Sequence, residues 1–198
     1  AYSVVRFCMK LPAYFLGHGS PMNAITPNPY AENWRRCGEA VRREYGAGLR
    51  AILCVSAHWQ TDGLAVTAMP QPRTLHDFGN FPPALFAVRY PASGSPQLAQ
   101  RLMQLLAADG IAADEGWGLD HGSWGVLCHL FPQADVPVVQ LSLNTRLSAR
   151  EHFQVATKLA PLREEGVLMV GSGNIVHNLR LLDWPSATEA GHGFEWAE

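Results

Sequence analysis

The chain has 198 residues, of which 47% are hydrophobic and 16% are charged, and its formal net charge is −2. This composition is typical of a globular domain with a substantial core, and it argues against disorder. Because basic residues neither dominate nor cluster, the sequence does not indicate nucleic-acid binding. Its apolar runs are far shorter than the ~20 residues that span a bilayer, so we expect no membrane segment.

The cysteines and the first residues indicate the compartment. The four cysteines show no CxxC spacing, and Cys54 and Cys128 lie in apolar runs. They are expected to be small buried hydrophobic residues in a reducing environment. The start of the chain, AYSVVRFCMK, lacks the charged start, apolar core and cleavage site of a secretion signal. Both observations favour a cytoplasmic location.

Strand and helix patterns alternate along the chain. In chain order we predict a strand at 13–17, a helix at 28–46, strands at 51–57 and 64–69, a helix at 95–110, a strand at 136–143, a helix at 148–166 and a strand at 167–173. Residues 70–91 and 117–125, rich in Pro, Gly and aromatic residues, are predicted to be loops. The alternation predicts a single α/β domain with a mostly parallel central sheet flanked by helices.

Three histidines follow predicted strands. His18 and His58 come directly after the strands at 13–17 and 51–57, and His177 follows the last strand by four residues. A single histidine in such a place is more often a hydrogen-bonded turn residue. However, ligands of open α/β sheets bind outside the carboxyl ends of the strands, so three such histidines are expected to meet at one edge. Imidazole suits zinc, iron and copper, and the pattern therefore predicts a shared metal site.

Further candidates lie in the two predicted loops and next to His58. His121 follows Asp120 in WGLDHGSWG, where Asp120 is a candidate orienting partner and a structural turn is the alternative. His76, in LHDFGNFP, lies either in a cover over the substrate or in a packed loop. Trp59, next to the second of the three histidines, is a candidate wall of an aromatic pocket. We assign all four to substrate binding as hypotheses.

Several motifs resemble, in order, those of the 4,5-DOPA extradiol dioxygenase family: FLGHGSPMN, VSAHW, HDFGNFP, RYPASGSP, WGLDHGSWG, VPVVQLSL and GSGNIVHNLR. The resemblance runs from about residue 11 to about residue 184. It implies a class III extradiol enzyme that cleaves the ring of a DOPA-like catechol with O2 to give a semialdehyde. It also implies Fe(II) as the catalytic metal. Zn(II), which binds such sites more tightly, is expected as a replacement in a purified or crystallised sample.

The resemblance also implies roles for individual residues. His18 and His58 match metal ligands of the family. His177 matches a histidine at the metal, which acts as a ligand or as an acid–base residue. His121 matches a histidine that lines the substrate site and binds or protonates the catechol. The expected partners are thus a small catechol and O2, and whether the protein forms a homo-oligomer is left open.

The end of the chain departs from the family pattern. The family completes its metal site with a further His or Glu in a C-terminal stretch, whereas this sequence stops at GHGFEWAE. We expect the native protein to continue with a segment that supplies this ligand; His192 and Glu195 are nominal substitutes. Two other functions remain alternatives, a zinc-dependent hydrolase on the same scaffold and a metal-binding protein without catalysis.

Overall fold

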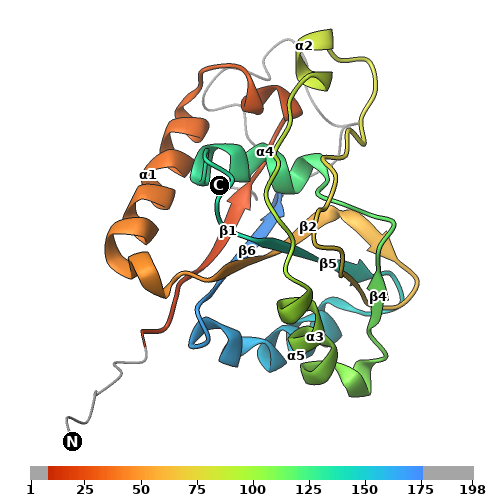
Figure 1. Ribbon diagram of the computed structural model, residues 1–198. Helices are drawn as coiled ribbons and strands as arrows, with labels where there is room; N and C mark the ends of the chain where they lie inside the picture. The colour runs from red at the N-terminus through yellow and green to blue at the C-terminus, as the bar shows by residue number, and fades with distance from the viewer. Residues whose placement is uncertain (1–8, 176–198) are drawn as a thin grey trace, which may run out of the picture.

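Six strands form one sheet within residues 9–175, which are the residues that the structure, a computed structural model, describes (Figure 1). The strands are β1 (Ala13–Gly17), β2 (Ala51–Thr61), β3 (Ala65–Thr67), β4 (Ala112–Asp114), β5 (Val138–Asn144) and β6 (Val167–Gly173). Their spatial order is β1-β6-β2-β5-β3-β4. Every neighbouring pair is parallel except β3 and β5, which are antiparallel. The predicted α/β class with a mostly parallel sheet is confirmed.

The described residues also form five α-helices. They are α1 (Pro29–Tyr45), α2 (Pro83–Phe86), α3 (Pro96–Leu105), α4 (His121–Leu130) and α5 (Ala149–Lys158). The starts of α1, α3 and α5 follow the sequence signals, since Asn28, Ser95 and Ser148 each accept a hydrogen bond from a backbone N–H of the first turn. None of these helices is long and apolar enough to cross a membrane.

The helices cover the two faces of the sheet, and each face has its own apolar core (Figure 1). Alternate residues of β2 supply both cores. Ile52 and Cys54 pack with α1 and α4, while Ala51 and Leu53 pack with α3 and α5. A strand that is buried on both faces reads as one continuous apolar run, which is why the sequence predicts it well. Burial also raises the pKa of the Cys54 thiol to about 12, as expected for a structural cysteine.

Helix α4 corrects the prediction of a loop at 117–125. Its start is capped by Asp120, whose side chain accepts a hydrogen bond from the backbone N–H of Ser123 at 2.9 Å. Most residues of α4 are buried, so the helix has no polar face and no amphipathic period in its sequence. Its glycines lower the helix propensity further. Both features concealed the helix from pattern reading.

Strand β2 is longer than the predicted strand at 51–57. It extends to Thr61, so His58 lies inside the strand and not at its exit. The pairing of β2 with β5 shifts register between Val55 and Gln60. This irregularity lies next to the histidine, and β-bulges of this kind re-aim side chains beside functional sites.

Candidate metal centre

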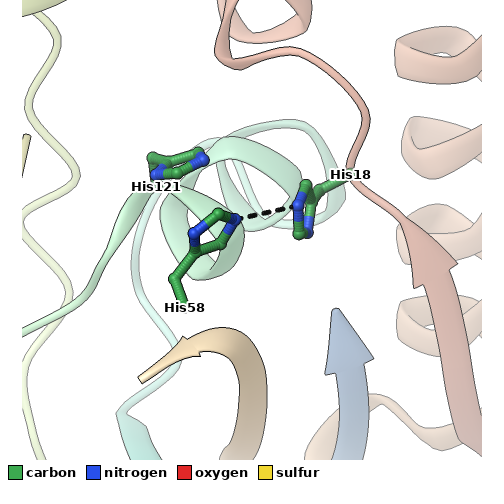
Figure 2. Close-up of side chains that lie close together, drawn as sticks. All are labelled: His18, His58 and His121. Carbon is green, nitrogen blue, oxygen red and sulfur yellow. Dashed lines mark hydrogen bonds between the residues drawn. The ribbon is translucent and has the colours of Figure 1, made fainter. Parts of the chain in front are cut away.

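Three histidine side chains converge beside the sheet (Figure 2). His18 follows β1, His58 lies on β2 and His121 is the first residue of α4. Each offers a ring nitrogen, and these three nitrogens lie within 4.8 Å of one another. His177, which the sequence places at the same site, lies outside the described residues. We call His18, His58 and His121 the histidine cluster.

Local structure explains how the cluster forms. The backbone N–H of His18 donates to the carbonyl of Gly173 at 3.2 Å, which continues the pairing of β1 with β6. His58 packs against α4 where Gly122 has no side chain, since a Cβ there would lie 2.9 Å from His58 Cδ2. The rings of His58 and His121 are consequently close, with centroids 3.9 Å apart. Because Gly122 has no side chain, the rings of His58 and His121 can lie next to each other.

The hydrogen bonds of Ser172 define the orientation of His18. Ser172 Oγ donates its proton to the carbonyl of Gly122, so it accepts from His18 Nδ1, which lies 3.0 Å away. The proton of His18 is therefore on Nδ1, and Nε2 presents its lone pair to the cluster. Histidine ligands of metals commonly donate their other ring N–H in this way.

Asp77 holds a similar position beside His121. Asp77 Oδ1 accepts the backbone N–H of His121 at 2.9 Å, and Oδ2 lies 3.0 Å from His121 Nδ1. The same Oδ2 lies 3.9 Å from His58 Nδ1. Burial raises the pKa of the Asp77 carboxyl, but the hydrogen bonds and charge of His121 outweigh it and hold this pKa below its usual value. Asp77 is thus a carboxylate at neutral pH.

Asp120, the partner that the sequence suggested for His121, has another task. Its carboxylate caps α4 and accepts a hydrogen bond from the side-chain amide of Gln140, and the residue is fully buried. In the structure it is Asp77 that lies beside the His121 ring, because the loop that follows β3 brings Asp77 to the first residue of α4. A contact of Asp120 with substrate stays a prediction.

The cluster fits a divalent metal ion. His18 Nε2 and His58 Nε2 lie 3.0 Å apart. An ion held by both would lie roughly 2.0–2.1 Å from each nitrogen, and the two Nε2 atoms are close enough together to reach one ion. The donor atoms are imidazole nitrogens, which suit iron and zinc. The assignment of His18 and His58 as ligands stays a prediction that this geometry favours.

Aromatic side chains border the cluster on the side of Asp77. The Phe78 ring meets the His121 ring edge to face, with centroids 5.5 Å apart, and it also packs on His76 at 5.7 Å. His76 Nε2 donates to the carbonyl of Val88 at 3.1 Å, so this histidine anchors the loop. Trp59 stacks on Trp117, with centroids 5.6 Å apart. Substrate contacts of His76 and Trp59 stay predictions.

A groove of about 680 Å³ reaches the cluster along the sheet. His58 and Ser172 are among the residues that line it. Phe15 also lines the groove; its ring lies over the glycines of β6, and the residue is 63% exposed. Within the described residues, the groove therefore gives small molecules an approach to His58.

Comparison with known proteins gives the relatives of this chain. The family described as the catalytic LigB subunit of aromatic ring-opening dioxygenase matches residues 12–196. A 4,5-DOPA dioxygenase extradiol of Escherichia coli (strain K12) is 51% identical over 182 residues, which are 91% of this chain and 65% of the relative. The protein of the same name from Beta vulgaris is 40% identical over 171 residues, or 83% of this chain and 62% of the relative.

One solved structure has the same fold and a similar sequence. It is a crystal structure of an uncharacterized protein from Escherichia coli K12, with 47% sequence identity and a TM-score of 0.73. The match covers 93% of this chain and 65% of that one. The chain thus spans just under two thirds of the length of these relatives.

Proposed function

Because this chain belongs to the family of the catalytic LigB subunit of aromatic ring-opening dioxygenases, we propose that it opens the ring of a catechol with dioxygen. The motif resemblance found in the sequence is confirmed by this family match. The histidine cluster is the observation that carries the proposal, because it gathers metal-binding side chains in the described part of such a chain. The names of the relatives make a DOPA-like catechol the proposed substrate. The resemblance of the sequence motifs implies a semialdehyde as the product.

The proposed resident metal is Fe(II), held by His18 and His58. When bound, it supplies open coordination positions and the redox chemistry that ring opening by dioxygen requires. The proton on His18 Nδ1 is engaged with Ser172, so this ring is fixed in place and suited to ligation only. The sequence also places His177 at the metal, and that assignment is part of the proposal.

His121 is the proposed acid–base residue. Its Nδ1 faces the Asp77 carboxylate, which favours a proton on that nitrogen and leaves Nε2 as the basic atom. Nε2 is then suited to accept a proton from a catechol hydroxyl. The Phe78 ring beside it offers an aromatic surface on the same side of the cluster. Proton acceptance by a positioned histidine typically contributes about 100-fold or more to the rate.

Anaerobic loading with Fe(II), followed by addition of L-DOPA and oxygenated buffer, tests the proposal. We expect oxygen uptake in step with the appearance of a yellow product. His18→Ala is expected to lose both iron and turnover. His152→Ala, a change on α5, is the matched control and is expected to retain both. Full iron content and turnover in His18→Ala would refute the proposed site.

His121→Ala separates the two roles open to this residue. If His121 acts on the substrate, the variant keeps its iron and its turnover falls by about 100-fold or more. Iron content by mass spectrometry and oxygen uptake are measured on the same sample, with circular dichroism as the check of folding. Loss of iron from a folded His121→Ala protein would make His121 a ligand and not an acid–base residue.

A further inference from the structure

Asp77 makes three contacts with the histidine cluster through two oxygens. Oδ1 accepts the backbone N–H of His121 at 2.9 Å, which fixes the start of α4. Oδ2 lies 3.0 Å from His121 Nδ1 and 3.9 Å from His58 Nδ1. One carboxylate therefore faces the ring nitrogens of two members of the cluster.

The need to cap α4 does not explain why the second oxygen of Asp77 faces the His121 ring. Asp120 already caps this helix through its bond from Ser123 N–H, and Asp77 binds a different N–H, that of the first helical residue. A helix start needs acceptors for its N–H groups, and one oxygen of Asp77 is enough for that purpose. Its second oxygen is turned to the imidazole.

Hydrogen bonds hold the loop that carries Asp77 against α4 and against the residues just before this helix. The backbone N–H of Leu75 donates to the carbonyl of Leu119 at 2.7 Å, and the Trp124 indole N–H donates to the carbonyl of Leu75 at 2.6 Å. The next residue after the carboxylate, Phe78, has its ring edge to face with His121. The loop thus places a negative charge and an aromatic surface against the same imidazole.

From these contacts we propose that Asp77 is a positioning residue that holds His121 with its proton on Nδ1 and its basic Nε2 toward the substrate. This inference rests on the proposed ring-opening function. In the proton-transfer step, a catechol O–H bond breaks and His121 Nε2 gains that proton, while the Asp77 carboxylate stays ionised. Oδ2 of Asp77, 3.0 Å from Nδ1, faces the imidazolium that forms, and the hydrogen bond that Oδ1 accepts from the backbone N–H fixes the residue that carries the ring.

Asp77→Asn tests the proposal because it preserves shape and removes the charge. The amide can still accept the His121 backbone N–H, but its NH2 group then faces Nδ1 and favours the other tautomer. We expect kcat to fall on the order of 10- to 100-fold, with KM and iron content little changed. Asp62→Asn, at an exposed ion pair with Arg146, is the matched control and is expected to turn over normally.

A second readout does not depend on turnover. Long-range 1H–15N spectra of the metal-free protein report which nitrogen of His121 carries the proton. We expect Nδ1–H in the wild type and a shift toward Nε2–H in Asp77→Asn. Asp77→Ser, which also retains an acceptor for the backbone N–H, gives the same test if the Asn variant does not fold.

The two readouts distinguish this proposal from the proposed function. An unchanged His121 tautomer and wild-type kcat in folded Asp77 variants would overturn the positioning role. A shifted tautomer in a protein whose wild type opens no catechol ring would support the role of Asp77 and refute the ring-opening function alone. A fall in kcat that Asp77→Glu restores in part would support a requirement for the carboxylate.

Discussion

The two ends of α4 each approach another element closely at a glycine, but with different consequences. At the C-terminal end, the backbone of Leu130 lies against Gly38 of α1, where an added Cβ would be 2.7 Å from the Leu130 carbonyl carbon. At the N-terminal end, Gly122 lies against Ser56 and His58 of β2. The first approach joins two helices through their backbones, and the second makes room for a histidine of the cluster. The same absence of a side chain thus serves packing at one end and the site at the other.

Gly38→Ala should disrupt the packing of α1 against the C-terminal end of α4 and give the largest loss of stability. The new methyl group meets backbone atoms of Leu130, which cannot rotate away, so α1 and α4 must separate. Overpacking of this kind costs about 3 kcal/mol in the free energy of unfolding. Urea denaturation measures this loss. Zinc bound per folded molecule should stay as in the wild type, and a specific loss of zinc would show that the two ends are coupled.

Asp120→Ala should give the next largest loss, although Asp120 is next to His121 in the sequence. The change removes the cap of α4, which costs about 1 kcal/mol, and it leaves the buried amide of Gln140 without its acceptor, which costs about 1 kcal/mol more. The urea midpoint should fall accordingly. If stability were retained while the proton of His121 moved between its ring nitrogens, Asp120 would be the orienting partner after all.

The sequence predicts the elements whose signals are local. The strand at 167–173 agrees with β6 because a buried parallel strand is one apolar run, and the strand at 13–17 agrees with β1, an edge strand that is apolar although Phe15 is exposed. Helix α4 was missed because a helix that is buried on nearly all sides lacks an amphipathic period. Burial of β6 leaves a continuous apolar run that predicts a strand, whereas burial of α4 removes the alternation of apolar and polar faces that would predict a helix.

The site was predictable in part for the same reason. Histidines near strand ends could be located from the sequence, and His18 and His58 do lie together. The carboxylate beside His121 could not, because Asp77 is 44 residues away in the chain and Asp120 is adjacent. A signal was present in the motif HDFGNFP, where a charged residue stands before an aromatic pair. Which carboxylate faces the ring depends on how the loop folds back on α4.

Gly122→Ala should affect the site end with a smaller loss of stability. The added methyl group meets Ser56 Oγ and lies 2.9 Å from His58 Cδ2, and a side chain is displaced more readily than a backbone. We expect a loss of about 1–2 kcal/mol in the free energy of unfolding. The displaced imidazole should weaken zinc binding about tenfold, which lowers the stabilisation by saturating zinc by about 1.4 kcal/mol.

Calorimetric titration with zinc and thermal melts with and without zinc measure both effects of Gly122→Ala. The comparison with Gly38→Ala is the decisive control, since that variant loses more stability at the far end of the same helix. If both variants lost zinc in proportion to their stability, the two ends of α4 would not differ in function, and His58 would depend on the general integrity of the fold.

Gly125→Ala should have the smallest effect and the opposite sign. Gly125 lies in α4 between the two close approaches, and an added Cβ there would meet nothing within 4 Å. Alanine restricts the unfolded chain more than glycine and favours a helix, so we expect a gain of about 0.5–1 kcal/mol in the free energy of unfolding. Zinc affinity should not change, because no atom of the cluster is displaced. A loss of stability in Gly125→Ala similar to that in Gly122→Ala would mean that α4 tolerates no added side chain along its buried length, and the special role of its two ends would have to be given up.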